Sequence, residues 1–199
     1  MAAWRRATRR DDDAALLLKA LGSGPAVEAE LEREIAAAQV VAGKTLDQAA
    51  PVVWRRGVLH DDEMPGLYTA CTHYISASRG EGWDLGMTEA GASGLALIAP
   101  AHTGYLAYLD ATVATMIPAR ATSPILHPDD IGAATYREAD WYEPDPEALT
   151  AAIADAVAGR AQATGAQARI RGAYDRRHAA AELLDAVVSL WPEEVARGR

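Results

Sequence analysis

The stretch SRGEGWDLGMTEAGASGLALIAP, residues 78–100, contains the features that decide the fold. A glycine-rich turn over residues 80–86 contains the acidic residue Glu81, and a second acidic residue, Glu89, follows the turn. The turn leads into a short helical pattern over 87–94, which is followed by a fully apolar run over 95–100. A short apolar run bounded by Gly and Pro is typical of a strand that is buried on both faces.

The rest of the chain repeats this alternation of short apolar runs and helical patterns. Asp145 and Pro146 suit the cap and first turn of a late helix. We expect an α/β fold, a parallel sheet with helices on both faces. Residues 1–199 form one domain in this interpretation, and the C-terminal helices, about 146–190, pack back on it. The other expected strands are 14–20, 52–54, 73–78 and 113–118, and the other expected helices are 26–43, the end of 61–72, 163–174 and 179–190.

Composition excludes several classes of function. The net charge of −9 argues against non-specific binding to nucleic acid or to an anionic membrane. No apolar run is long enough for a transmembrane segment. The single cysteine, Cys71, cannot form an internal disulfide, and the basic start of the chain lacks the apolar region of a secretory signal. We therefore expect a cytoplasmic protein.

The turn and its two acids suggest a nucleotide-sugar site. Free N–H groups at a helix start attract anions, and glycines let an anion such as a diphosphate come close. Glu89 could accept hydrogen bonds from two ribose hydroxyls, and Glu81 could hold sugar hydroxyls or a developing positive charge. The alternative is that Glu81 caps the helix and Glu89 is a solvated helix residue. The histidines show no metal-ligand spacing, so no metal site is expected.

The Glu-x7-Glu spacing resembles the donor-binding motif of the group 1 retaining glycosyltransferases, which have the GT-B fold. Three further blocks resemble the same family in the same order, so that the resemblance covers about residues 59–174. These blocks are GLYTACTHYISAS at 66–78, HTGYLAYLD at 102–110 and ADWYEPDPEALTAAI at 139–153.

The resemblance implies the C-terminal half of a GT-B enzyme, a single Rossmann-like parallel sheet flanked by helices. It implies a hexosyltransferase-type enzyme that binds a UDP- or GDP-sugar and transfers the glycosyl group with retention, without a divalent metal or other cofactor. Glu81 would be the catalytic contact to the transferred sugar, and Glu89 would hold the ribose. The donor would also be lined by Gly82, Trp83, Asp84 and Leu85.

Three departures from the family pattern matter. Gly86 stands where the family usually has Pro, and Asp84 adds a negative charge near the expected diphosphate. The acceptor-binding half of a GT-B enzyme is missing. Several alternatives follow: an enzyme completed by a partner chain or a homodimer, a non-catalytic nucleotide-sugar-binding or scaffold domain, and a fragment of a longer enzyme. A nucleotide-sugar epimerase is a more distant one. Trp83 either stacks on a sugar or fills a gap.

Overall fold

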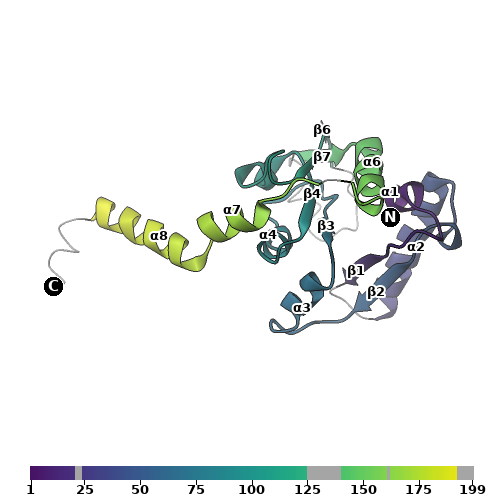
Figure 1. The fold of residues 1–199 in the computed structure, drawn as a ribbon, viewed down its shortest axis with the longest axis horizontal. Coiled ribbons are helices and arrows are strands. Elements are labelled where there is room, and N and C mark those ends of the chain that lie inside the picture. The colour runs from purple at the N-terminus through teal and green to yellow at the C-terminus, as the bar shows by residue number, and fades with distance from the viewer. Residues whose placement is uncertain (21–23, 125–139, 161, 192–199) are drawn as a thin grey trace.

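Three parallel strands lie at the centre of the computed structural model, which describes residues 1–20, 24–124, 140–160 and 162–191 (Figure 1). Their order is β3-β4-β5 and both pairs are parallel, as the alternating pattern predicts. The strands are β3 (His73–Ile75), β4 (Ala96–Pro100) and β5 (Thr115–Ile117).

Helices cover both faces of this sheet. Leu97 and Ala99 of β4 belong to one apolar cluster, whereas Ile98 belongs to a second one. Successive residues of a strand point to opposite faces, so the two clusters lie on opposite sides of β4. The expectation of a doubly covered strand at 95–100 is therefore confirmed.

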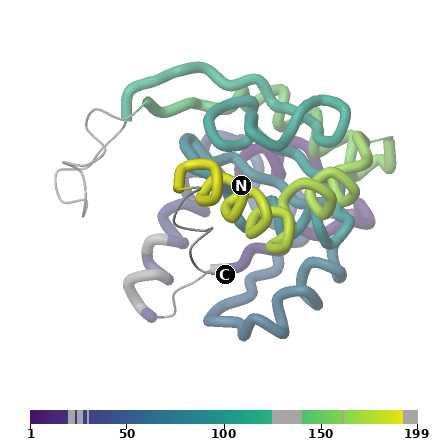
Figure 2. The backbone as a smooth tube through the Cα atoms, turned by 90° about the vertical axis from the view of Figure 1, so that its left-hand side faces the viewer, coloured from purple at the N-terminus to yellow at the C-terminus, as the bar shows by residue number. Residues whose placement is uncertain are grey.

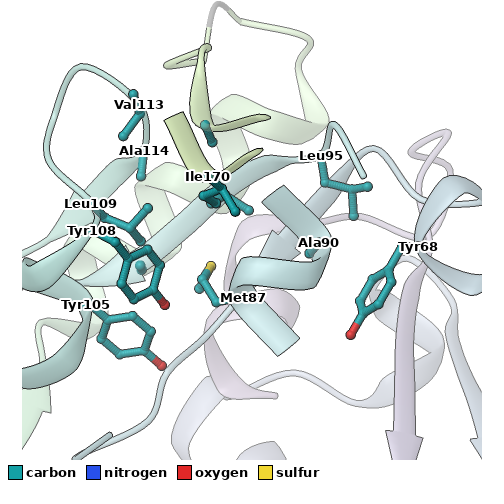
Figure 3. Packing of buried hydrophobic residues seen from close by; sticks show 13 residues of the cluster. Tyr68, Met87, Ala90, Leu95, Tyr105, Tyr108, Leu109, Val113, Ala114 and Ile170 are labelled. Atoms are coloured by element: carbon teal, nitrogen blue, oxygen red, sulfur yellow. The ribbon is translucent and has the colours of Figure 1, made fainter. Parts of the chain in front are cut away.

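The first cluster surrounds α4 (Leu85–Ala92). Figure 3 shows Met87 and Ala90 of this helix with Tyr105 and Tyr108 on one side and Tyr68 on the other. Gly91 brings α7 close, because a Cβ there would lie 2.5 Å from Ile170 Cδ1. The neighbouring elements are α3 (Met64–Thr69), the 3-10 helix η2 (Thr103–Ala107) and α7 (Ala166–Ala173).

The second cluster joins α1 (Ala2–Ala7) and α6 (Pro146–Val157) to the opposite face. The Trp4 indole N–H donates to the Ala50 carbonyl oxygen at 3.0 Å. As predicted, Asp145 caps α6 by accepting from the N–H groups of Glu147 and Ala148.

The strands β1 (Leu16–Ala20) and β2 (Val52–Arg56) form a separate parallel pair. Among the described strands no ladder joins this pair to β3, although Leu16 and Val52 pack against the second cluster. The structure thus differs from the single sheet expected. The face of β2 that carries Val53 and Arg55 is exposed, in contrast to the two covered faces of β4. The pair is accompanied by α2 (Pro25–Ala42) and the 3-10 helix η1 (Leu46–Gln48).

An antiparallel ribbon, β6 (Ala119–Thr122) and β7 (Trp141–Pro144), follows the central sheet (Figure 2). The segment between these strands, 125–139, lies outside the described residues. The N–H of Tyr142 donates to the carbonyl oxygen of Arg79 at 2.8 Å. The ribbon is therefore attached to the loop that follows β3.

The last helix, α8 (Arg176–Leu190), projects from the body (Figure 1). It begins three residues earlier than expected because Asp175 caps it by accepting from the His178 N–H at 2.7 Å. None of its residues is buried. We expected the helices over 146–190 to pack back on the domain. α6 and α7 do so, but α8 does not, because the described part of the chain buries none of its apolar side chains.

Candidate functional site

The loops after β3 and β4 meet in direct backbone contact. The Gly104 N–H donates to the Glu81 carbonyl oxygen at 3.0 Å, and the Glu81 N–H donates to Thr103 Oγ1 at 3.3 Å. A Cβ on Gly104 would lie only 2.4 Å from the Gly82 carbonyl oxygen, so this approach requires glycine. The backbone of Glu81 is thereby held at the carboxyl edge of the central sheet, where ligands bind in open α/β folds.

Asp84 begins α4 and is held by two donors. One carboxylate oxygen accepts from the Met87 N–H at 3.0 Å and the other from the Tyr105 hydroxyl at 2.8 Å. The alternative that Glu81 caps this helix is therefore wrong, because Asp84 caps it. The expected helix start at 87 moves to Leu85 for the same reason. Both carboxylate oxygens of Asp84 are thus engaged by these donors. The first-turn N–H groups of Leu85 and Gly86 have no intrahelical acceptor, as at any helix start.

Backbone strain is concentrated at this edge. Among the described residues, Asp84 (φ 62°) and Thr103 (φ 39°) are the non-glycine residues with positive φ. Such conformations persist only where the surrounding structure imposes them, and they cluster at functional sites. Here the two strained residues flank the contact between Glu81 and Gly104.

Three carboxylates act on the hydroxyl group of Tyr74. Burial first, and then the charges of Asp84, Glu81 and Glu89, raise the pKa of Tyr74 to about 12. The Tyr74 ring lies 6.3 Å from the Tyr68 ring, measured between centroids. The Tyr74 hydroxyl also explains why residue 86 is a glycine, because a Cβ at this position would lie 2.6 Å from the hydroxyl oxygen.

Glu89 is exposed on α4 but is not merely solvated. Its carboxylate accepts from the Tyr68 hydroxyl at 2.8 Å. Burial first, and then this hydrogen bond, raise the pKa of Tyr68. A ligand hydroxyl could replace the Tyr68 hydroxyl at the exposed side of Glu89.

The Glu81 side chain is half-buried, and among the described residues its carboxylate has no hydrogen bond or ion pair. Gly82 beside it is exposed, and Leu85 is 70% exposed. Trp83 packs on two tyrosines. Its ring packs at 4.8 Å from Tyr108 and 5.2 Å from Tyr174, measured between centroids, so it fills a gap in the first cluster.

The sequence offers one basic side chain near these acids. Arg79 is the sole lysine or arginine between residues 77 and 108. Its Nε lies 2.5 Å from a carboxylate oxygen of Glu143, and its guanidinium lies 5.9 Å from the Trp141 ring centroid. Arg79 is therefore engaged by β7. This pairing joins residues 64 positions apart, and no local pattern signals it.

His102 holds the loop that follows β3 in place. It is 2% exposed, its Nε2 lies 2.9 Å from the Ser78 carbonyl oxygen, and its Nδ1 lies 2.8 Å from Thr103 Oγ1. Its ring also stacks on Tyr142 at 5.1 Å. Both ring nitrogens thus have partners within the protein, so His102 positions the loop.

The described residues, 1–20, 24–124, 140–160 and 162–191, form neither a metal-ligand cluster nor a membrane-spanning helix. Within these ranges, no three side chains of His, Cys, Asp or Glu are grouped as a metal site would require. No described helix combines the length and the apolar character that crossing a bilayer needs.

Comparison with protein-family models found none that matches the chain, and comparison with curated proteins found no match either. Any assignment of function therefore depends on the residue pattern and on the geometry of the site.

Proposed function

We propose that the chain binds a nucleoside diphosphate sugar at the edge formed by residues 81–89. In this proposal it is the donor-binding half of a retaining glycosyltransferase of the GT-B type, and β3, β4 and β5 belong to its Rossmann-like sheet. The observation that carries the proposal is the placement of Glu81 and Glu89 on either side of the start of α4, at the carboxyl edge of the central sheet, together with the unengaged carboxylate of Glu81. We also propose a cytoplasmic location, which suits a chain with one free cysteine.

The chemical roles follow from the two acids and the helix start between them. The first-turn N–H groups of Leu85 and Gly86 would donate to the diphosphate and stabilise the charge that develops on it as the sugar leaves. Glu89 would exchange its Tyr68 hydrogen bond for the ribose hydroxyls. Glu81 would bind the transferred sugar and stabilise the positive charge that develops at its anomeric carbon.

Calorimetry with UDP, GDP and ADP, and with UDP- and GDP-sugars, tests these roles. Glu89→Gln should weaken nucleotide binding about tenfold, the effect of one charged hydrogen bond. Glu81→Gln should leave nucleotide affinity unchanged and reduce the additional affinity that the sugar provides. Glu32→Gln, an exposed residue of α2, is the matched control. Absence of binding at millimolar concentration, or equal and negligible effects of both variants, would contradict the proposal.

A second candidate is a binding or scaffold domain without turnover. The engagement of Arg79 by Glu143 favours it, because no other lysine or arginine of residues 77–108 can neutralise a leaving diphosphate. A partner chain or second copy that carries the acceptor half could supply such charges. Incubation of the chain with a UDP-sugar separates the candidates: release of free UDP indicates an enzyme, whereas binding without release indicates a binding domain.

A further inference from the structure

The projecting helix α8 has one continuous apolar face. At 100° per residue, the large apolar side chains of residues 183–191 fall within an arc of about 160°. Glu182, Asp185 and Ser189 lie on the opposite side. The exposed fractions are 67% for Leu183, 61% for Leu184, 38% for Val187, 37% for Val188, 68% for Leu190 and 54% for Trp191.

A helix of this length gains little stability by itself. α8 has 15 residues, none of them buried. Isolated helices of about 12–15 residues are marginal in water, and helices in proteins are stabilised mainly by packing of an apolar face. A helix with a segregated and uncovered apolar face therefore requires a partner.

We propose that α8 pairs in antiparallel orientation with α8 of a second copy of this chain. The two halves of the helix are complementary in size. The first half contains the alanines of residues 179–181, and the second half contains the large apolar residues. An antiparallel pair centred near Leu184 places Val187 and Val188 opposite these alanines, so that large side chains meet small ones.

The charges favour the same orientation. Arg176 and Arg177 occupy the first turn of α8, where the positive end of the helix dipole disfavours them. Antiparallel pairing brings the negative end of the partner helix next to these arginines. It also brings Trp191 of one copy opposite Arg177 of the other, which allows a cation–π contact. A parallel pair would instead gather all four arginines at one end.

The pairing is independent of nucleotide-sugar binding, because it involves no residue of 81–89. Sedimentation equilibrium of the whole chain across a micromolar range tests it. The expected mass at high concentration is twice 21.1 kDa, and Leu184→Glu should yield monomers at every concentration. Ser189→Glu, on the polar side of the same helix, should leave the dimer intact. A monomeric wild-type chain, or a Leu184→Glu variant that still dimerises, would overturn the proposal.

A cross-linking experiment tests the orientation. In a Cys71→Ser background, one preparation carries Arg177→Cys and a second carries Trp191→Cys. Oxidation of the mixture should form disulfides chiefly between the two different chains. Disulfides chiefly between identical chains would show parallel pairing and would overturn the antiparallel arrangement.

Discussion

The helices α4 and α8 contain similar proportions of apolar residues but meet opposite environments. α4 buries Met87 and Ala90 completely between β4, η2 and α7, whereas α8 buries nothing. The difference shows that the spacing of apolar residues predicts a helix and its apolar face. It does not predict which element covers that face. In this molecule the covered helix supports the candidate binding site, and the uncovered helix forms the proposed interface between copies.

The largest expected effect compares a buried and an exposed residue of these helices. Met87→Ala should lower the free energy of unfolding by about 2–5 kcal/mol, because it leaves a cavity beside α4. Leu184→Ala should change it by less than about 0.5 kcal/mol in dilute, monomeric protein. Urea unfolding followed by circular dichroism measures both. Equal losses would show that α8 packs on the body in solution.

The next effect concerns the loop that holds α4 in place. Gly104→Ala should destabilise the protein by about 1–3 kcal/mol, because the new methyl group collides with the Gly82 backbone. Gly66→Ala is the matched control, since a Cβ there meets nothing within 4 Å and alanine favours the helix α3. In thermal unfolding, the midpoint temperature should fall for Gly104→Ala but not for Gly66→Ala. A tolerated Gly104→Ala would contradict the close approach of the two loops.

The start of α4 gives a smaller effect. Asp84→Ala removes the cap and leaves the Tyr105 hydroxyl without this acceptor, so we expect a loss of about 1–2 kcal/mol. Asp84→Asn keeps a side-chain acceptor and tolerates the positive φ, and should cost less than Asp84→Ala. Chemical unfolding of the two variants tests this order. Equal losses would indicate that the carboxylate charge, rather than the cap geometry, stabilises the helix.

The smallest effect concerns the ion pair between Arg169 and Asp110, which attaches α7 to the body of the domain. Among the described residues, no ion pair of this kind attaches α8. The Thr112 hydroxyl and then the Arg169 guanidinium, 2.7 Å away, lower the pKa of Asp110 to about 2. A lowered carboxyl pKa means that this contribution to stability is present above the ordinary carboxyl pKa and is lost as the pH falls towards 2.

Arg169→Ala tests the contribution of the guanidinium to this attachment. The variant should raise the pKa of Asp110 part of the way to its ordinary value, because the Thr112 contacts remain. Titration of the carboxyl carbon by NMR reports the pKa directly. An unchanged midpoint in the variant would show that Arg169 does not attach α7 through Asp110.

Local patterns predicted β4 and α6 well but missed α1 and the antiparallel ribbon of β6 and β7. The apolar run at 95–100 and the cap at Asp145 correspond to β4 and α6 because burial and capping are encoded within a few residues. The start of α4 was predicted two residues late, since a left-handed Asp84 gives no local signal. The separation of β1 and β2 from the central sheet depends on packing between distant segments, which periodicity does not describe.

The candidate site was predictable only in part. The spacing of Glu81 and Glu89 singled out both acids, and the structure places them on either side of the start of α4. The contact of Tyr68 with Glu89 and that of Tyr105 with Asp84 each join residues 21 positions apart. Such pairs depend on how α3, η2 and α4 pack, so sequence reasoning did not find them.

The hydrogen bond from Gly104 to Glu81 also has a mechanical consequence. A ligand that displaced Glu81 would also displace the start of η2. In that segment, the Tyr105 hydroxyl donates a hydrogen bond to Asp84, the cap of α4. Movement at the acid would therefore reach the helix through the main chain of η2 and the hydrogen bond from Tyr105 to Asp84.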